Sequence, residues 1–156
     1  MQMHIDYVIA QYTAAKRDTP DALLMIEEKL DMTDYIEEGF GTGDDVVIGD
    51  GVLEVIDLKY GKGVKVYAKE NPQGMLYGLG ALSATELMFD IHTVRITITQ
   101  PRLDSISSWD ISAEDLKKWG EDVIKPKAKM AYVGEGELVA GDHCKFCKAK
   151  AKCRAP

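Results

Sequence analysis

Residues 44–59 read DDVVIGDGVLEVIDLK and predict two strands joined by a tight turn. Residues 52–58 form a long run rich in Val, Leu and Ile, which is typical of a strand. The shorter strand before it is expected to start at Asp45, after the glycine-rich residues 39–43. Gly49-Asp50-Gly51 lies between the two runs, and an Asp-Gly pair readily takes the positive φ that a hairpin turn requires. This hairpin is the starting point for predicting the fold.

Apolar spacing on both sides of the hairpin predicts three helices and two more strands. The helices are expected over residues 3–17, 71–87 and 112–130, with a proline early in the second and a serine cap before the third. Residues 93–99 alternate as a strand, and residues 22–30, whose period is unclear, are assigned to a strand because the next elements along the chain are strands. The predicted fold is therefore α/β, with a small mixed β-sheet flanked by helices.

The composition is that of one ordinary globular domain. The chain has 156 residues, of which 46% are hydrophobic and 29% charged. No apolar run approaches the ~20 residues of a membrane-spanning helix. The first residues also lack the basic and apolar pattern of a secretory signal. We therefore expect a cytoplasmic protein without a membrane partner.

The charge is unevenly distributed along the chain. The formal net charge is -7, which opposes non-specific binding to nucleic acids, because such binding depends on Lys and Arg. Residues 142–156, however, contain five basic side chains against one carboxylate, that of Asp142. An acidic body with a basic tail fits an enzyme that gathers carboxylates around metal ions. It equally fits a soluble protein without such a site.

Three charged residues are expected to converge at one end of the hairpin. Asp44 precedes Asp50 by six residues and Asp57 follows it by seven, so antiparallel pairing brings both carboxylates to the same end. Lys59 lies two residues beyond Asp57, which places both side chains on one face of an extended strand. Asp45 is a rival for Asp44, but it is expected to point to the opposite face.

Two carboxylates and a lysine in this pattern have a use in phosphodiester hydrolysis. Hard cations such as Mg²⁺ take one or two carboxylates together with several waters. The bound metal lowers the pKa of water and stabilises the attacking and leaving oxygens. A lysine can orient the water or hold a phosphate oxygen as a point charge. The alternative is a surface ion pair beside an Asp-Gly turn, a common feature of proteins without such chemistry.

Three short segments occur in a set order along the chain. They are Gly41-Thr42-Gly43-Asp44, residues 55–61 (VIDLKYG) and Gln73-Gly74-Met75-Leu76-Tyr77. Together they resemble the patterns Gly-x-x-Asp, Asp/Glu-x-Lys and Gln-x-x-x-Tyr of the RecB-like branch of the PD-(D/E)XK nucleases. The likeness is to phage and prophage exonucleases of this branch, and it extends from Glu27 to the C-terminus. It implies a restriction-endonuclease-like core and a Mg²⁺- or Mn²⁺-dependent DNA exonuclease of phage or prophage recombination or repair.

The resemblance also assigns roles to single residues. Asp44, Asp57 and the backbone carbonyl of Leu58 would hold the metal ion, and Lys59 would be the catalytic lysine. Gln73 and Tyr77 would lie one helical turn apart and face the site and the DNA backbone. Without the family, these two equally fit an exposed glutamine and a tyrosine at the edge of the core. The implied partners are DNA and recombination proteins of a bacterium or phage.

One part of the family pattern has no clear counterpart near the start of the chain. Related nucleases have an upstream helix whose His or Glu contributes to the metal site, whereas His4 stands in no such motif and is expected at the surface. Glu28 is an additional candidate acid. We therefore expect residues 1–140 to form a nuclease core that is shortened at its N-terminus. The alternative function is a catalytically incomplete DNA-binding or scaffolding domain that retains the nuclease fold.

All three cysteines lie in the last thirteen residues, within a basic tail of residues 141–156 that is expected to be irregular. Cys144 and Cys147 form Cys-x-x-Cys, and Cys153 follows six residues on, a spacing that suits Zn²⁺ or an iron–sulfur cluster. Unligated thiols or a zinc-ribbon-like interaction module are the alternatives. The tail also resembles that of iron–sulfur RecB-like nucleases, which implies a structural 4Fe-4S cluster. The fourth cysteine of that pattern is absent, so an N-terminal extension, His143 or a partner would complete the site, or no cluster forms.

Overall fold

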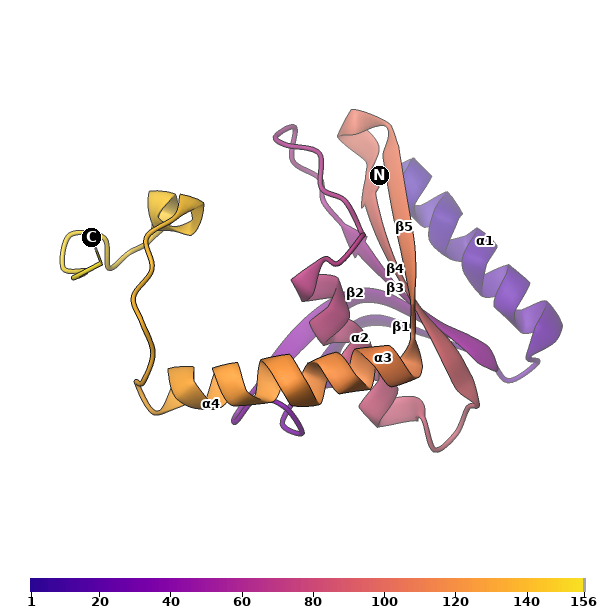
Figure 1. Cartoon of the computed structure of the whole chain (residues 1–156). Coiled ribbons are helices and arrows are strands. Elements are labelled where there is room, and N and C mark those ends of the chain that lie inside the picture. Colours follow the sequence, from indigo (N-terminus) through magenta and orange to yellow (C-terminus); the bar gives the residue numbers. More distant parts are fainter. Residues whose placement is uncertain (156) are drawn as a thin grey trace.

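The computed structural model describes residues 1–155, and Pro156 lies outside the described part. A helix, three strands, a second helix, two strands and a final helical segment follow one another along the chain (Figure 1). Their bounds are α1 (Gln2–Asp18), β1 (Leu23–Asp31), β2 (Phe40–Ile48), β3 (Gly51–Leu58), α2 (Pro72–Thr85), β4 (Ile91–Gln100), β5 (Ser105–Ser112), α3 (Ala113–Trp119) and α4 (Lys125–Tyr132). A π-helical turn (Gly120–Ile124) joins α3 to α4, and two 3₁₀ turns cover Pro101–Leu103 and Asp142–Phe146.

The five strands form one mixed sheet in chain order, β1 to β5. Neighbouring strands are antiparallel except for β3 and β4, which are parallel. The parallel pair follows from α2, because a helical crossover returns the chain to the same end of the sheet. The predicted α/β class, with a small mixed sheet flanked by helices, is therefore confirmed.

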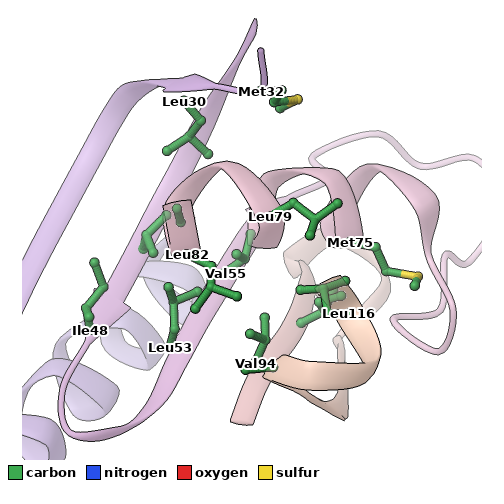
Figure 2. Close-up of a cluster of buried hydrophobic side chains, with 14 of the residues drawn as sticks. Leu30, Met32, Ile48, Leu53, Val55, Met75, Leu79, Leu82, Val94 and Leu116 are labelled. Atoms are coloured by element: carbon green, nitrogen blue, oxygen red, sulfur yellow. The ribbon is translucent and has the colours of Figure 1, made fainter. Parts of the chain in front are cut away.

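The sheet is covered on both faces. Figure 1 shows α1 on one face, and α2 and α3 on the other. The larger core lies on the α2 face, where Figure 2 shows side chains from β1 to β4 packed against α2 and α3. The labelled members of this core are Leu30, Met32, Ile48, Leu53, Val55, Met75, Leu79, Leu82, Val94 and Leu116. On the α1 face, Val8 packs in a smaller cluster with Val47 and Ile56.

Glycines allow α2 to lie close to the sheet. A Cβ atom on Gly74 would lie 2.4 Å from Cγ2 of Ile96, and one on Gly78 would lie 3.0 Å from Cγ1 of Val94. A larger residue at position 74 would therefore push the helix away from β4. This close packing holds the first turn of α2 in a defined place beside the end of β3.

Most of the predicted elements are present, with two differences. The predicted hairpin turn is confirmed, with φ of +90° at Gly51, and residues 22–30 do form a strand. The strand β2, however, begins at Phe40, so the glycine-rich residues belong to the sheet. The strand β5 was not predicted, because its residues are mostly polar and only its alternate side chains are shielded from solvent.

The last part of the chain extends away from the sheet beyond α4 (Figure 1). Almost every residue from 133 to 155 is exposed. No helix among residues 1–155 is long and apolar enough to cross a membrane.

Candidate active site

The hairpin brings Asp44 and Asp57 together. Strands β2 and β3 pair antiparallel, with Asp45 opposite Ile56. The backbone N–H of Leu58 donates a hydrogen bond of 2.8 Å to Oδ2 of Asp44. The Asp44 carboxylate therefore lies against the peptide that joins Asp57 to Leu58. The two carboxylates lie at the same end of the hairpin, as the count of residues around the turn predicted.

Lys59 continues β3 beyond its last residue and contacts both the strand and α2. Its backbone N–H donates to the carbonyl of Thr99 at 2.9 Å, which keeps the chain beside β4. Its Nζ lies 2.9 Å from Oδ2 of Asp57 and donates to Oε1 of Gln73 at 2.8 Å. Asp57 and Lys59 thus share the face of the sheet that α2 covers, as their spacing predicted.

Gln73 and Tyr77 extend this chain of contacts along α2. The side-chain amide of Gln73 donates to the hydroxyl of Tyr77 at 3.0 Å. The side chain of Asn71 caps the helix by accepting a bond from the N–H of Gly74 at 3.0 Å. A Cβ atom on Gly41 would lie 2.6 Å from Cε1 of Tyr77, so only glycine leaves room for this ring. The first and third of the three predicted motif segments are therefore in direct contact.

The buried Oδ2 of Asp57 is paired with a lysine. Asp57 is only 6% exposed, and no neutral hydrogen-bond donor within residues 1–155 reaches its Oδ2. The ammonium of Lys59 lies 2.9 Å from this oxygen and balances its charge. A buried carboxylate is costly unless it is paired, and Lys59 is the partner here.

His4 occupies a different place from the one predicted. It is buried, not at the surface. Its Nε2 lies 2.9 Å from Oδ2 of Asp45, and its Nδ1 lies 2.8 Å from Oγ1 of Thr99. Asp45 therefore faces α1, opposite to Asp57, as expected. Burial raises the pKa of the Asp45 carboxyl, and the nearby His4 partly offsets this rise. The helical spacing of His4 and the core residue Val8 was the signal that could have placed this histidine.

A second buried carboxylate is not indicated by any motif of the sequence. Glu54 is 3% exposed on the face that α1 covers. Its Oε1 accepts hydrogen bonds from the hydroxyls of Tyr7 at 2.8 Å and Thr97 at 2.6 Å. Burial raises the pKa of Glu54, although these hydrogen bonds lower it. The other candidate acid, Glu28, is exposed in β1 opposite Gly43.

The donor set at the end of β3 suits a hard cation. Two carboxylates, those of Asp44 and Asp57, together with the carbonyl of Leu58 match the oxygen ligands that Mg²⁺ takes along with waters. This set contains only two side-chain ligands, because residues 1–155 contain no group of three or more His, Cys, Asp or Glu side chains placed to hold a metal ion.

The cysteines of the tail are not gathered into such a group either. Cys144 is partly buried, while Cys147 and Cys153 are exposed, and all three are free thiols. The N–H of Cys147 bonds to the carbonyl of Cys144 at 3.2 Å, which turns the Cys-x-x-Cys segment back on itself. The zinc or 4Fe-4S site stays a prediction.

The fold and this cluster define a mixed α/β domain with two acids, a lysine, a glutamine and a tyrosine at one end of its sheet. Over residues 1–156 the chain matches a family model described as "Protein of unknown function (DUF2800)", and it belongs to that family. Among solved structures it is similar to one described as "Crystal structure of SSO0001", at 14% sequence identity and a TM-score of 0.45. That match covers 98% of this chain and 67% of the other.

Proposed function

We propose that this chain is a metal-dependent DNA nuclease of the RecB-like branch of the PD-(D/E)XK superfamily. One observation carries the proposal: Asp44, the buried Asp57 and Lys59 converge at the end of β3, where Lys59 Nζ lies 2.9 Å from Asp57 Oδ2 and is held by Gln73. The order of the three motif segments adds to it. Within this proposal, the protein is an exonuclease that hydrolyses DNA in the cytoplasm during phage or prophage recombination or repair, with recombination proteins as further partners.

The residues of the cluster divide the work of phosphodiester hydrolysis. A Mg²⁺ or Mn²⁺ ion held by Asp44, Asp57 and the Leu58 carbonyl would polarise the phosphate and lower the pKa of water. The ammonium group of Lys59 has three donors. One reaches Gln73, and the group also lies beside Asp57. A further donor remains for a phosphate oxygen or the attacking water. There the positive charge of the ammonium group would stabilise the negative charge that develops in the transition state.

Gln73 has a positioning role in this arrangement. Its Oε1 holds the lysine, and its amide holds the Tyr77 hydroxyl. The Tyr77 ring rests on Gly41, so β2, α2 and the lysine are fixed relative to one another. Catalytic groups need this kind of rigid support, because small displacements from the productive geometry reduce the rate strongly.

The test is cleavage of linear and closed-circular DNA with Mg²⁺ or Mn²⁺, comparing the unchanged protein with Lys59→Ala and Asp57→Asn. Exposed Lys118 and Asp122 provide the matched controls Lys118→Ala and Asp122→Asn. We expect metal-dependent loss of linear DNA that falls about a hundredfold or more in the two site variants and is unchanged in the controls. Attack on linear DNA alone supports an exonuclease, whereas nicking of circles shows an endonuclease.

A DNA-binding or scaffolding domain without catalysis is the second candidate. It is favoured by the lack of a three-residue metal-binding group within residues 1–155. This candidate predicts that the protein binds DNA in EDTA and leaves it intact in both metals. Cleavage that the Lys59→Ala change abolishes would rule this candidate out.

A further inference from the structure

The segment between β3 and α2 forms an exposed basic arm, defined here as residues 60–70. It contains three lysines, Lys62, Lys65 and Lys69, against one glutamate, in a chain whose net charge is -7. Two tyrosines of the arm are also exposed, Tyr60 by 49% and Tyr67 by 62%. Figure 1 shows the arm projecting from the same end of the sheet as the turn between β4 and β5. The arm begins directly after Lys59 and therefore at the candidate active site.

The backbone of the arm is held in place by polar side chains of β4 and β5. The side chain of Gln100 is buried; it accepts a hydrogen bond from the N–H of Val66 at 2.7 Å and donates to the carbonyl of Val64 at 3.3 Å. The N–H of Ala68 donates to Oγ of Ser107 at 3.0 Å. These bonds tie the arm to β4 and β5. Its exposed side chains are thus displayed from a defined backbone.

Each exposed tyrosine of the arm has a cation beside its ring. The guanidinium of Arg102 lies 5.5 Å from the centre of the Tyr60 ring, and Nζ of Lys65 lies 5.4 Å from that of Tyr67. Both distances are within the range of cation–π contacts. A ring face beside a positive charge offers a base a stacking surface and offers its phosphate a counter-charge.

We infer that the arm is a binding surface for single-stranded DNA that leads the strand to Lys59. Bases stack on Tyr60 and Tyr67, while Lys62, Lys65 and Arg102 contact phosphates. Unpaired bases fit this surface, because a base within a duplex has no free face to stack on an exposed ring. The delivery to Lys59 rests on the proposed nuclease function, but the binding itself does not.

Fluorescence anisotropy with labelled oligo-dT and a matched duplex tests the inference, using the full chain in EDTA so that no cleavage occurs. We expect Tyr60→Ala/Tyr67→Ala to weaken oligo-dT binding about tenfold or more and Tyr60→Phe/Tyr67→Phe to retain it. We expect Lys62→Gln/Lys65→Gln to reduce the salt dependence of the affinity by about 1.4 in log–log slope. Tyr132→Ala and Lys16→Gln, at positions outside the arm, are the controls and should bind as the unchanged protein does.

The outcomes separate this inference from the proposed function. Oligo-dT affinity that is absent, or equal in the double-alanine and unchanged proteins, overturns the inference whether or not DNA is cleaved with metal. A loss of affinity for the duplex equal to that for oligo-dT also overturns it, because stacking on unpaired bases would then not be the cause. If the affinity falls as expected but the unchanged protein cleaves nothing in Mn²⁺, the nuclease proposal fails and the binding surface stands.

Discussion

The buried carboxylates on the two faces of the sheet have different partners. Under α1, Asp45 contacts His4, and Glu54 accepts hydrogen bonds from two hydroxyls. Under α2, Asp57 is buried to a similar degree, but its Oδ2 is paired with the partly exposed ammonium of Lys59 at 2.9 Å. The acids under α1 attach that helix to the sheet.

This difference indicates which acid the protein keeps for chemistry. The acids under α1 are bonded to side chains of that helix and contribute to the fold. Asp57 is paired with Lys59, whose side chain is 32% exposed and can therefore reach a ligand. The alternation of side chains along a strand separates Asp45 from Asp44 and Glu54 from Asp57, because the members of each pair are an odd number of residues apart. Single substitutions on each face test this difference between the carboxylates.

The largest effect is expected at Asp57. Asp57→Asn keeps the shape of the side chain and removes its charge, so cleavage should fall about a hundredfold or more. The free energy of unfolding should fall by about 1–3 kcal/mol, because Asn loses the ion pair with Lys59, and the variant should remain folded. Urea denaturation beside the cleavage assay checks both. A variant that loses activity only because it unfolds would contradict this assignment.

A medium effect is expected at His4, on the opposite face. His4→Ala leaves Asp45 buried beside a cavity, and we expect a loss of about 1–3 kcal/mol in the free energy of unfolding. His92→Ala is the matched control, because His92 pairs with Asp90 at the exposed surface, where ion pairs contribute little. Urea denaturation of both variants measures the two losses in the free energy of unfolding. Equal effects from the two changes would show that the buried pair is no more important than the surface pair.

The smallest effect is expected at Glu54 and depends on pH. Burial raises the pKa of Glu54, so the folded chain binds this proton more tightly than the unfolded chain. Stability from this group is therefore greatest below the ordinary glutamate pKa of about 4.3 and is lost as the pH rises through the folded pKa. Glu54→Gln can keep both hydrogen bonds without the charge. Its melting temperature should exceed that of the unchanged protein at pH 7, and the difference should shrink as the pH falls. A difference in melting temperature that does not change with pH would contradict the raised pKa of Glu54.

Local patterns were enough to predict that Asp44, Asp57 and Lys59 converge, and the family resemblance added Gln73 and Tyr77. The turn at Gly49-Asp50-Gly51 sets the register of its two strands, and this register brings Asp44 to Asp57. The two-residue spacing of a strand brings Lys59 to Asp57, and the four-residue spacing of a helix aligns Gln73 with Tyr77. Each relation lies within one hairpin or one helix, so it needed no knowledge of distant contacts.

The residues on the α1 face could not be found in this way. His4 meets Asp45 and Thr99 across intervals of 41 and 95 residues, and nothing local shows which face of the sheet α1 covers. The polar strand β5 was missed for a related reason: it belongs to the sheet through its pairing with β4, while its own residues lack an apolar run.

The sequence by itself determined the hairpin, the helix that follows it and the convergence of Asp44, Asp57 and Lys59, because turn chemistry and the period of a strand act over short distances. Only the tertiary structure decided which partner each carboxylate has. The partner depends on which helix covers each face and on how closely glycines such as Gly41 and Gly74 let that helix approach. Asp57 is paired with Lys59, and Gln73 holds this lysine, because the chain brings the first turn of α2 to this end of the sheet.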